Sequence, residues 1–584
     1  MADRFSLLPS AARLRGASPL WRADFRAAFR LAWHWLYGRR ESLLVGAILL
    51  VTALAHGINM FHFPYYETDE GTYMSQAWAV VREARLAPYT YIYDHAPGGW
   101  LQIAGWVALT GGFERFGNTV ESGRVLMLLF QVGSTLALYR IARSLTGSIA
   151  IATITTLLFA LSAYGLLYHR RVLLDNIATF WMLIAVLALV SGRLSLGRVW
   201  LSAVALGISI LSKEITLFLI PALALLTYHR AHRTQRAFAT LGWLALVVSI
   251  FSGYLLLAIL KNELFPPNYH AVGSIVFGGT DPHVSLIETL RWQAGRNKDA
   301  GLLDLGSKFW QVAQVWLRDE PLLVVGGTVA AFVGVLLIRR ERDAGILGLA
   351  TCSLWLFLCR GGETLNFYLL PLLPLLALNI GFVLAILTRR WVVTGGASAR
   401  APSARASSAW GRDPPSRYSA CRACWQGTPA PTWGWRAARP LTAARRSAPC
   451  PGRGIRRFAQ QQAVDWIRRN IAPDAAIVID NYAWTDLHDT AGGDPSYERA
   501  HWYLEGAAGR HDQERRLLQR LALRRLYRHH LATPDRHRCK RTHAGGRCGE
   551  ALEPRRALQY RRVAGGGAPR RQVPPVGSHA GPPP

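Results

Sequence analysis

Long apolar runs separated by short polar stretches dominate the first 390 residues of the chain. Each run approaches the roughly 20 residues that a helix needs to cross a hydrocarbon core. Apolar and polar residues do not alternate within the runs, as they would in the strands of a membrane β-barrel. The pattern predicts an all-α polytopic membrane protein with about 10–11 spans.

Basic residues mark one end of most runs, as at Arg140, Arg193 and Arg389. The positive-inside rule therefore places these ends, and the basic residues 1–40, in the cytoplasm. Two longer loops, 62–122 and 261–321, then lie outside, and residues 72–81 and 100–109 of the first loop predict short interfacial helices. The predicted spans are 43–61, 123–141, 148–167, 172–190, two short spans within 199–228, 238–260, 322–337, 344–358 and 367–387.

The net charge of +31 comes mainly from two stretches and not from a nucleic-acid-binding surface. Residues 391–456 carry +10 and residues 504–584 carry +12, and together they hold five of the seven cysteines. Both stretches are rich in Arg, Pro and Gly without helical or strand periodicity. The ordinary explanation is a disordered basic segment. Trp and Cys are unusual in such segments, so a second hypothesis is that two frameshifts produced them.

Ordinary protein sequence returns between these stretches, in residues 457–503. Helical spacing begins at Phe458, and Ala475 to Asp480 has the pattern of a buried strand, so we expect a small α/β remnant of a C-terminal domain. The predicted organisation is a cytoplasmic N-terminus (1–40), a transmembrane domain (41–390), and the segments 391–456, 457–503 and 504–584. Ten spans leave residue 390 in the cytoplasm, which would place the remnant there as well.

The first external loop carries the candidate for the chemistry, the acid pair Asp69–Glu70. A carboxylate beside the membrane surface can take a proton from an acceptor hydroxyl as a general base. The flanking Tyr66 and Tyr73 suit stacking against a sugar. The alternative is a solvated pair of loop acids.

Four further polar groups interrupt apolar sequence, and all face the outside in the predicted topology. A buried Asp costs roughly 2.5–3.5 kcal/mol to insert unless it is paired, so we expect Asp175 to pair with an Arg four or five residues earlier. Cations on this side can hold a lipid phosphate through charge-assisted contacts, and the alternatives are a turn, a structural ion pair and snorkelling. The groups are His95 before Pro97, Arg170–Arg171 with Asp175, Lys213–Glu214, and Arg360 with Tyr368.

In order and spacing these features resemble the GT-C superfamily of membrane glycosyltransferases. The similar families are the dolichyl-phosphate-mannose protein mannosyltransferases and the aminoarabinose transferases, and the resemblance covers about residues 40–390. It implies an inverting glycosyltransferase of the inner (plasma) membrane with an extracytoplasmic active site. The donor would be a polyprenyl-phosphate-linked sugar, such as mannose or another hexose or pentose, and the acceptor a protein, lipid or glycan.

The resemblance also implies residue roles. Asp69 would be the base, with Glu70 and Asp175 as further catalytic residues. The turn before Pro97 has His95 and Ala96 where aminoarabinose transferases carry a Lys, which leaves the phosphate contact open there. Some GT-C enzymes use a divalent metal and others do not, and no ligand cluster in the chain decides between them. A divalent metal therefore stays an open alternative, while no metal-ligating residue is predicted. The alternatives are a lipid-linked-substrate transporter or flippase, and an inactive frameshifted relic. The residues implied to bind substrate are Tyr66, Tyr73, His95, Arg170, Arg171, Lys213, Glu214, Arg360 and Tyr368.

Overall fold

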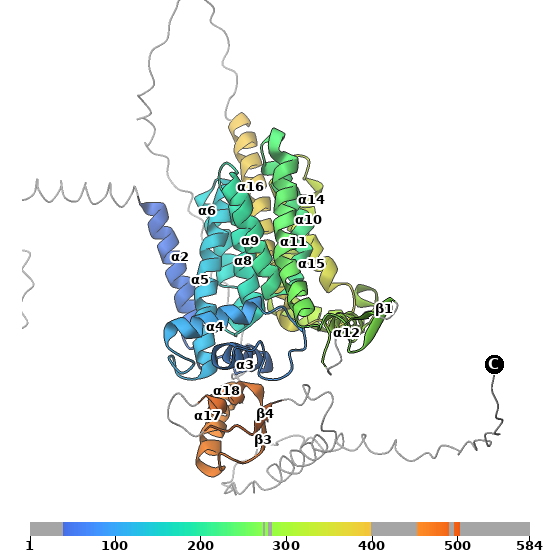
Figure 1. Cartoon of the computed structure of the whole chain (residues 1–584). Helices are drawn as coiled ribbons and strands as arrows, with labels where there is room; N and C mark the ends of the chain where they lie inside the picture. Colours follow the sequence, from blue (N-terminus) through green and yellow to red (C-terminus); the bar gives the residue numbers. More distant parts are fainter. Residues whose placement is uncertain (1–38, 273–274, 278–282, 399–451, 490–495, 503–584) are drawn as a thin grey trace, which may run out of the picture. The chain divides into compact units, whose positions relative to one another are not determined.

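The computed structural model describes residues 39–272, 275–277, 283–398, 452–489 and 496–502. By its contacts the chain divides into Met1–Gln519 and Arg520–Pro584, and every described residue belongs to the first unit. These residues are mainly helical, with two small two-stranded sheets (Figure 1). The predicted fold class is therefore confirmed. The segments 391–456 and 504–584 lie outside the described residues, except where helices α16 and α17 extend into the first.

Four helical stretches in the described part of the chain are long and apolar enough to cross a membrane. They are α2 (Arg40–Gly57), α5 (Thr119–Thr146), the stretch Arg233–Leu260 that contains α11 (Arg236–Leu260), and the stretch Asn366–Arg389 within η6 (Asn366–Leu369) and α16 (Leu372–Ser398). A fifth candidate is a pair of helices bent by 107°, α13 (Lys308–Asp319) with the segment Leu322–Leu336, which comprises the π-helix η5 (Leu322–Gly327) and α14 (Thr328–Leu336).

Shorter apolar helices pack beside these stretches and complete one bundle (Figure 1). At 17 residues, α8 and α9 are each about 25 Å long, close to the lower limit for a span. The bundle agrees with the predicted spans to within a few residues at most ends and defines a multi-pass membrane protein. The shorter members are α6 (Ile149–Ala160), α8 (Leu174–Val190), α9 (Leu196–Ser212), α10 (Ile220–Arg230) and α15 (Arg342–Leu358).

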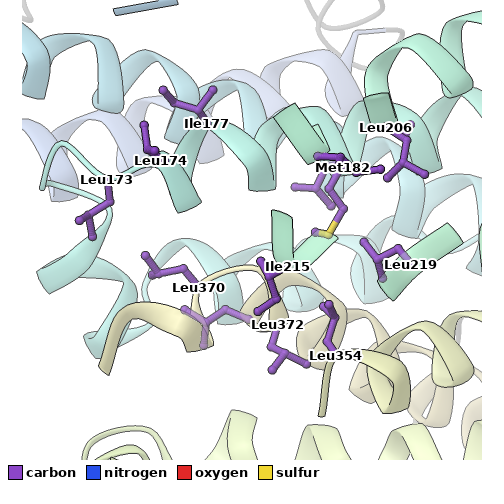
Figure 2. Packing of buried hydrophobic residues seen from close by; sticks show 14 of the residues in the cluster. Leu173, Leu174, Ile177, Met182, Leu206, Ile215, Leu219, Leu354, Leu370 and Leu372 are labelled. Carbon is purple, nitrogen blue, oxygen red and sulfur yellow. The ribbon is translucent and has the colours of Figure 1, made fainter. Parts of the chain in front are cut away.

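The bundle is held together by a continuous apolar core. Figure 2 shows its centre, where side chains of α8, α9 and the 3₁₀ helix η2 (Glu214–Leu219) meet those of α15 and the segment leading into α16. Each of these side chains is almost completely excluded from solvent. Because lipid tails are as apolar as leucine, close van der Waals packing, and not removal from water, stabilises these contacts within a bilayer. The labelled residues are Leu173, Leu174, Ile177, Met182, Leu206, Ile215, Leu219, Leu354, Leu370 and Leu372.

Two short helices lie at one end of the bundle, α3 (Thr68–Glu83) and α4 (Gly98–Thr110) (Figure 1). Both were expected, but each begins earlier than the apolar pattern suggested. Glu67 and Glu70 form a capping box at the start of α3, which satisfies backbone amides that the helix leaves unpaired. The Asp69–Glu70 pair therefore lies in the first turn of a helix and not in a loop. This end of the bundle is called the site end below.

The loop 261–321 begins with a β-hairpin and returns to the bundle through helices. Asp299 organises the middle of this loop, because its carboxylate accepts bonds from the backbone amides of Gly301, Lys308 and Gly362. Those bonds tie the loop to the turn that follows α15. The elements are β1 (Tyr269–Val272), antiparallel to β2 (Ile275–Phe277), then α12 (Leu286–Gly295), η4 (Gly301–Leu303) and α13.

The C-terminal part that the structure describes has the order helix, strand, helix, strand. It comprises α17 (Gly452–Asn470), β3 (Ile477–Ile479), α18 (Asn481–His488) and β4 (Ala500–Trp502), and the two strands pair in parallel. Its own small core includes Val464, Leu487 and Tyr497.

Helix α18 packs directly against α3 at the site end. The Asn481 amide donates to the Thr72 hydroxyl at 2.6 Å, and Arg82 pairs with Asp489 at 2.8 Å. A Cβ on Gly71 would lie 2.2 Å from the backbone nitrogen of Tyr482, so only glycine permits this approach. The expectation that residues 457–503 lie at the opposite, cytoplasmic end is therefore wrong for this structure.

Candidate functional site

The site end holds a network of charged side chains in close contact. Its members are Lys213, His95, Asp175 and Glu214. Lys213 Nζ lies 3.0 Å from His95 Nε2 and 3.7 Å from Asp175 Oδ2. On its other side, His95 Nδ1 lies 3.0 Å from Glu214 Oε2, and the Ala96 amide donates to Glu214 Oε1 at 2.6 Å. If the Lys213 ammonium donates to Nε2, the neutral imidazole carries its proton on Nδ1 and donates to Glu214.

The backbone explains how these residues meet from distant positions in the chain. α9 ends at Ser212, and Lys213 then takes an extended conformation (φ −154°, ψ 118°) before η2 begins. Because of this break, Lys213 belongs to neither α9 nor η2. The turn that carries His95 packs against the break, and a Cβ on Gly98 would lie only 2.7 Å from the Leu211 carbonyl oxygen. Glycine is thus what brings the His95 turn close to Lys213.

Asp175 is buried in the first turn of α8, and neither carboxylate oxygen accepts a hydrogen bond from the described residues. Its counter-charge is Lys213. The expected pairing with an arginine four or five residues earlier is wrong. Arg170 donates to the carbonyls of Ala55 and Phe63, and Arg171 pairs with Glu67. Arg170 therefore ties the start of α8 to the end of α2 and the segment after it, and Arg171 ties it to the N-terminus of α3.

Asp69 and Tyr73 lie one turn apart on α3 and within electrostatic reach of the network. Burial raises the pKa of Asp69, with Asp94 and Glu70 adding to the rise while Lys213 and His95 oppose it. The ring of Tyr73 is buried and its centroid lies 6.4 Å from that of His95. Burial also raises the pKa of Tyr73 well above its ordinary value, so it stays a neutral hydroxyl.

His95 experiences opposing influences. Burial and the Lys213 cation lower its pKa, but Glu214 and Asp94 outweigh them and leave the pKa above its ordinary value. The imidazole therefore holds a proton more readily than an exposed histidine does.

Glu70 has a different environment from its neighbour Asp69. Its carboxylate is fully buried and receives Nε and Nη2 of Arg124 at 2.9 and 2.7 Å. The backbone amides of Val172 and Glu67 also donate to it. Arg124 is equally buried and also donates to the carbonyls of Met60 and Pro64. All the oxygens of Glu70 are thus occupied by the pair that anchors α3 to the bundle.

Tyr66 also contacts protein and not open space. Its hydroxyl donates to Glu121 at 3.2 Å and accepts from Asn118 at 2.6 Å, and its ring lies under Arg124. These contacts place Tyr66 in the joint between α3 and α5. A stacking role toward a sugar is therefore less supported for Tyr66 than for Tyr73.

Tyr368 lies beside the network, whereas Arg360 is at its rim. Lys213 Nζ is 5.6 Å from the centroid of the Tyr368 ring. Arg360 is exposed, packs on the Phe357 ring at 3.7 Å and donates to the Phe357 carbonyl at 2.7 Å. Its guanidinium remains accessible at the edge of the site.

Asp94 is a member of the site that the sequence did not single out. Its charge raises the pKa of both Asp69 and His95, and its buried Oδ1 has no hydrogen-bond partner among the described residues. The only sequence signal was its place beside His95 in a motif chosen for the histidine and proline. Within the described residues, no group of three or more His, Cys, Asp or Glu side chains is arranged to hold a metal ion.

Residues 95–256 match the family model described as dolichyl-phosphate-mannose-protein mannosyltransferase. This range contains His95, Asp175, Lys213 and Glu214. No curated protein sequence matches the chain. The family match confirms the resemblance to the GT-C superfamily of membrane glycosyltransferases.

Three solved structures show remote similarity. ArnT from Cupriavidus metallidurans, bound to undecaprenyl phosphate, is 18% identical over 62% of this chain and 64% of its own, with a TM-score of 0.43. The Archaeoglobus fulgidus oligosaccharyltransferase in the apo form is 11% identical over 63% and 53%, with a TM-score of 0.40. The S. cerevisiae Pmt1-Pmt2 protein O-mannosyltransferase complex, bound to the sugar donor, is 18% identical over 38% and 34%, with a TM-score of 0.32. The chain thus spans less than two thirds of the length of each.

Proposed function

We propose that this chain is a membrane glycosyltransferase that moves a sugar from a polyprenyl-phosphate donor to an acceptor hydroxyl on the extracytoplasmic face of the inner membrane. The observation that carries this proposal is the meeting of Asp69 with the Lys213–His95 pair at one end of the bundle. A carboxylate that can accept a proton and a cation that can hold a phosphate are the two groups that such a transfer needs.

Asp69 acts as the general base in this proposal. Its raised pKa makes it a stronger base than an exposed aspartate. Tyr73, on the same helix, offers a ring and a neutral hydroxyl to the sugar. Glu70 supports the base indirectly, because its bond to Arg124 fixes the first turn of α3.

Lys213 and His95 hold the phosphate that leaves. Asp175 holds the lysine ammonium from one side, while Glu214 fixes the imidazole from the other. The ammonium is buried, so its attraction for a phosphate oxygen is screened less than it would be in water. Arg360 and Tyr368 extend this side of the site toward the solvent.

The transfer balances without another reactant. The acceptor oxygen loses its proton to Asp69 and forms a bond to the anomeric carbon from the face opposite the phosphate. The bond between that carbon and the phosphate oxygen breaks, and its electrons leave with the polyprenyl phosphate. The configuration at the anomeric carbon is therefore inverted.

The first test is a transfer assay with a radiolabelled polyprenyl-phosphate hexose and membranes that contain the whole chain. Asp69→Asn should reduce transfer at least about 100-fold, the usual lower range for losing a general base, while insertion stays normal. A control variant, Asp304→Asn, changes an exposed aspartate of the second loop and should leave transfer intact. Full transfer by Asp69→Asn would exclude this aspartate as the base.

The same assay separates the two alternatives. A transporter or flippase would move the lipid-linked sugar between leaflets without breaking its bond to phosphate. Transporter sites usually lie near the middle of the bilayer on interrupted helices, whereas Asp175 and Lys213 lie at helix ends. An inactive relic would release and transfer nothing even before Asp69 is changed.

A further inference from the structure

A second charged cavity lies at the end of the bundle opposite the candidate site. It has a volume of about 430 Å³, within the usual range for ligand pockets. The turn between α14 and α15 forms one side, and the last turn of α5 and the middle of α16 form the others. The lining residues that matter here are Arg339, Arg340, Arg342, Arg389, Glu341 and Asp343.

The two acids in this cavity already have arginine partners. Asp343 receives Nη2 and Nε of Arg230 at 2.7 and 3.2 Å. Glu341 lies 3.7 Å from Arg389 Nη1. Three guanidinium groups, those of Arg339, Arg340 and Arg342, then remain exposed and without a hydrogen-bond or ion-pair partner in the described part of the chain. The cavity therefore has a surplus of positive charge.

The inner wall of the cavity is apolar. Phe382, Ala385 and Ile386 of α16 line it together with Leu145 of α5. Leu387 of α16 and Leu336 of α14, next to these lining segments, are 56% and 82% exposed. On a helix that crosses a bilayer such leucines face lipid chains, so the apolar wall adjoins the lipid-facing surface.

We propose that this cavity binds the phosphate of an anionic membrane phospholipid, with the acyl chains lying along α14 and α16. Guanidinium groups pair with phosphate oxygens in a bidentate manner. Basic pockets between membrane helices are typical sites for anionic headgroups. The apolar wall favours a lipid over free phosphate, because a free anion gains nothing from Phe382 or Ile386. The proposal is independent of the transferase activity.

The test uses the whole chain in nanodiscs made of equal parts phosphatidylglycerol and phosphatidylcholine. After release into mild detergent, native mass spectrometry measures the phospholipid that stays bound. The wild type should retain phosphatidylglycerol at least about fivefold over phosphatidylcholine. The variant Arg339→Gln/Arg340→Gln/Arg342→Gln should lose that preference. Ala385→Trp, which fills the apolar wall without changing charge, should lower retention of either lipid.

A matched control is Arg193→Gln/Arg198→Gln, which removes one charge from the loop between α8 and α9 and one from the first turn of α9, at the same end of the bundle but outside the cavity. It should keep the preference. Equal retention of the two lipids by the wild type would overturn the proposal, as would equal losses in the triple variant and this control. Inorganic phosphate at 10 mM is the last arm. Displacement of phosphatidylglycerol by phosphate would show a free-anion site and overturn the lipid assignment.

Discussion

Asp69 and Glu70 are adjacent carboxylates, but only Glu70 has an ion-pair partner, Arg124, among the described residues. The sequence showed that two acids lay near the membrane. It did not show which acid faces the site, because that depends on Arg124, 54 positions further along the chain from Glu70. A buried arginine inside an apolar run was the signal available, since such a charge needs a carboxylate partner.

The buried pair leads to a prediction about stability. Glu70→Gln removes one charge and leaves Arg124 buried without its counter-charge, so it should destabilise the protein by roughly 3–5 kcal/mol. Asp69→Asn should change stability far less, because Asp69 has no such pair. Thermal unfolding of the purified proteins in detergent measures both. In a double-mutant cycle, Glu70→Gln with Arg124→Met should cost less than the sum of the single changes.

The environment of Asp69 also predicts the pH dependence of transfer. A general base works only when deprotonated, so the rate should rise with pH as it passes through the pKa of Asp69. Since burial raises that pKa, the acid limb should lie above the ordinary range of aspartate. Asp94→Asn removes a carboxylate that contributes to the rise, so its acid limb should shift to lower pH. Rate profiles from pH 4 to 8 test this, and a limb that Asp94→Asn leaves unmoved would contradict it.

At the scale of elements, the contact between α3 and α18 determines how the helix of Asp69 is held. Sequence periodicity predicted part of α3 but not α18, and it carried no information that the two helices touch, because their contact joins segments about 400 positions apart. The Lys213–His95 contact joins residues 118 positions apart, and the sequence pattern could not predict it either. What the sequence did indicate was the break at Lys213 and the turn at His95, each of which interrupts an apolar run.

A substitution at Gly71 tests the contact between α3 and α18. Gly71→Ala would place a methyl group against the Tyr482 backbone, so α18 must move away from α3 and transfer should fall by about tenfold or more, as small displacements at a site do. Hydrogen exchange of residues 481–488 should become faster. Gly105→Ala in α4 is the matched control, because its added methyl group meets no atom within 4 Å. Unchanged exchange in Gly71→Ala would show that α18 does not depend on this approach.

At the scale of the whole molecule, apolar periodicity and the positive-inside rule predicted the bundle because each span is recognised locally. Predictions about the ends of helices were less accurate. α2 ends four residues before the apolar run does, and α5 extends beyond its predicted span at both ends. Capping residues and loop contacts set those ends, and they act independently of hydropathy.

The docking of α18 on α3 places residues 481–488 at the site end, where α16 begins. α16 starts at Leu372 beside the site and, with 27 residues, extends about 40 Å to the opposite end. Gln460 of α17 nevertheless exchanges hydrogen bonds with the backbone of Tyr66 at the site end. Ser398 and Gln460 therefore lie at opposite ends of the bundle.

The coding DNA of residues 399–451 tests the frameshift hypothesis. Residues 399–451 contain no apolar run of the length that a crossing needs. We expect one of the other two reading frames of this region to encode an uninterrupted apolar stretch of about 20 residues, and resequencing the gene should recover it. If neither frame contains such a stretch, the frameshift hypothesis fails for this region.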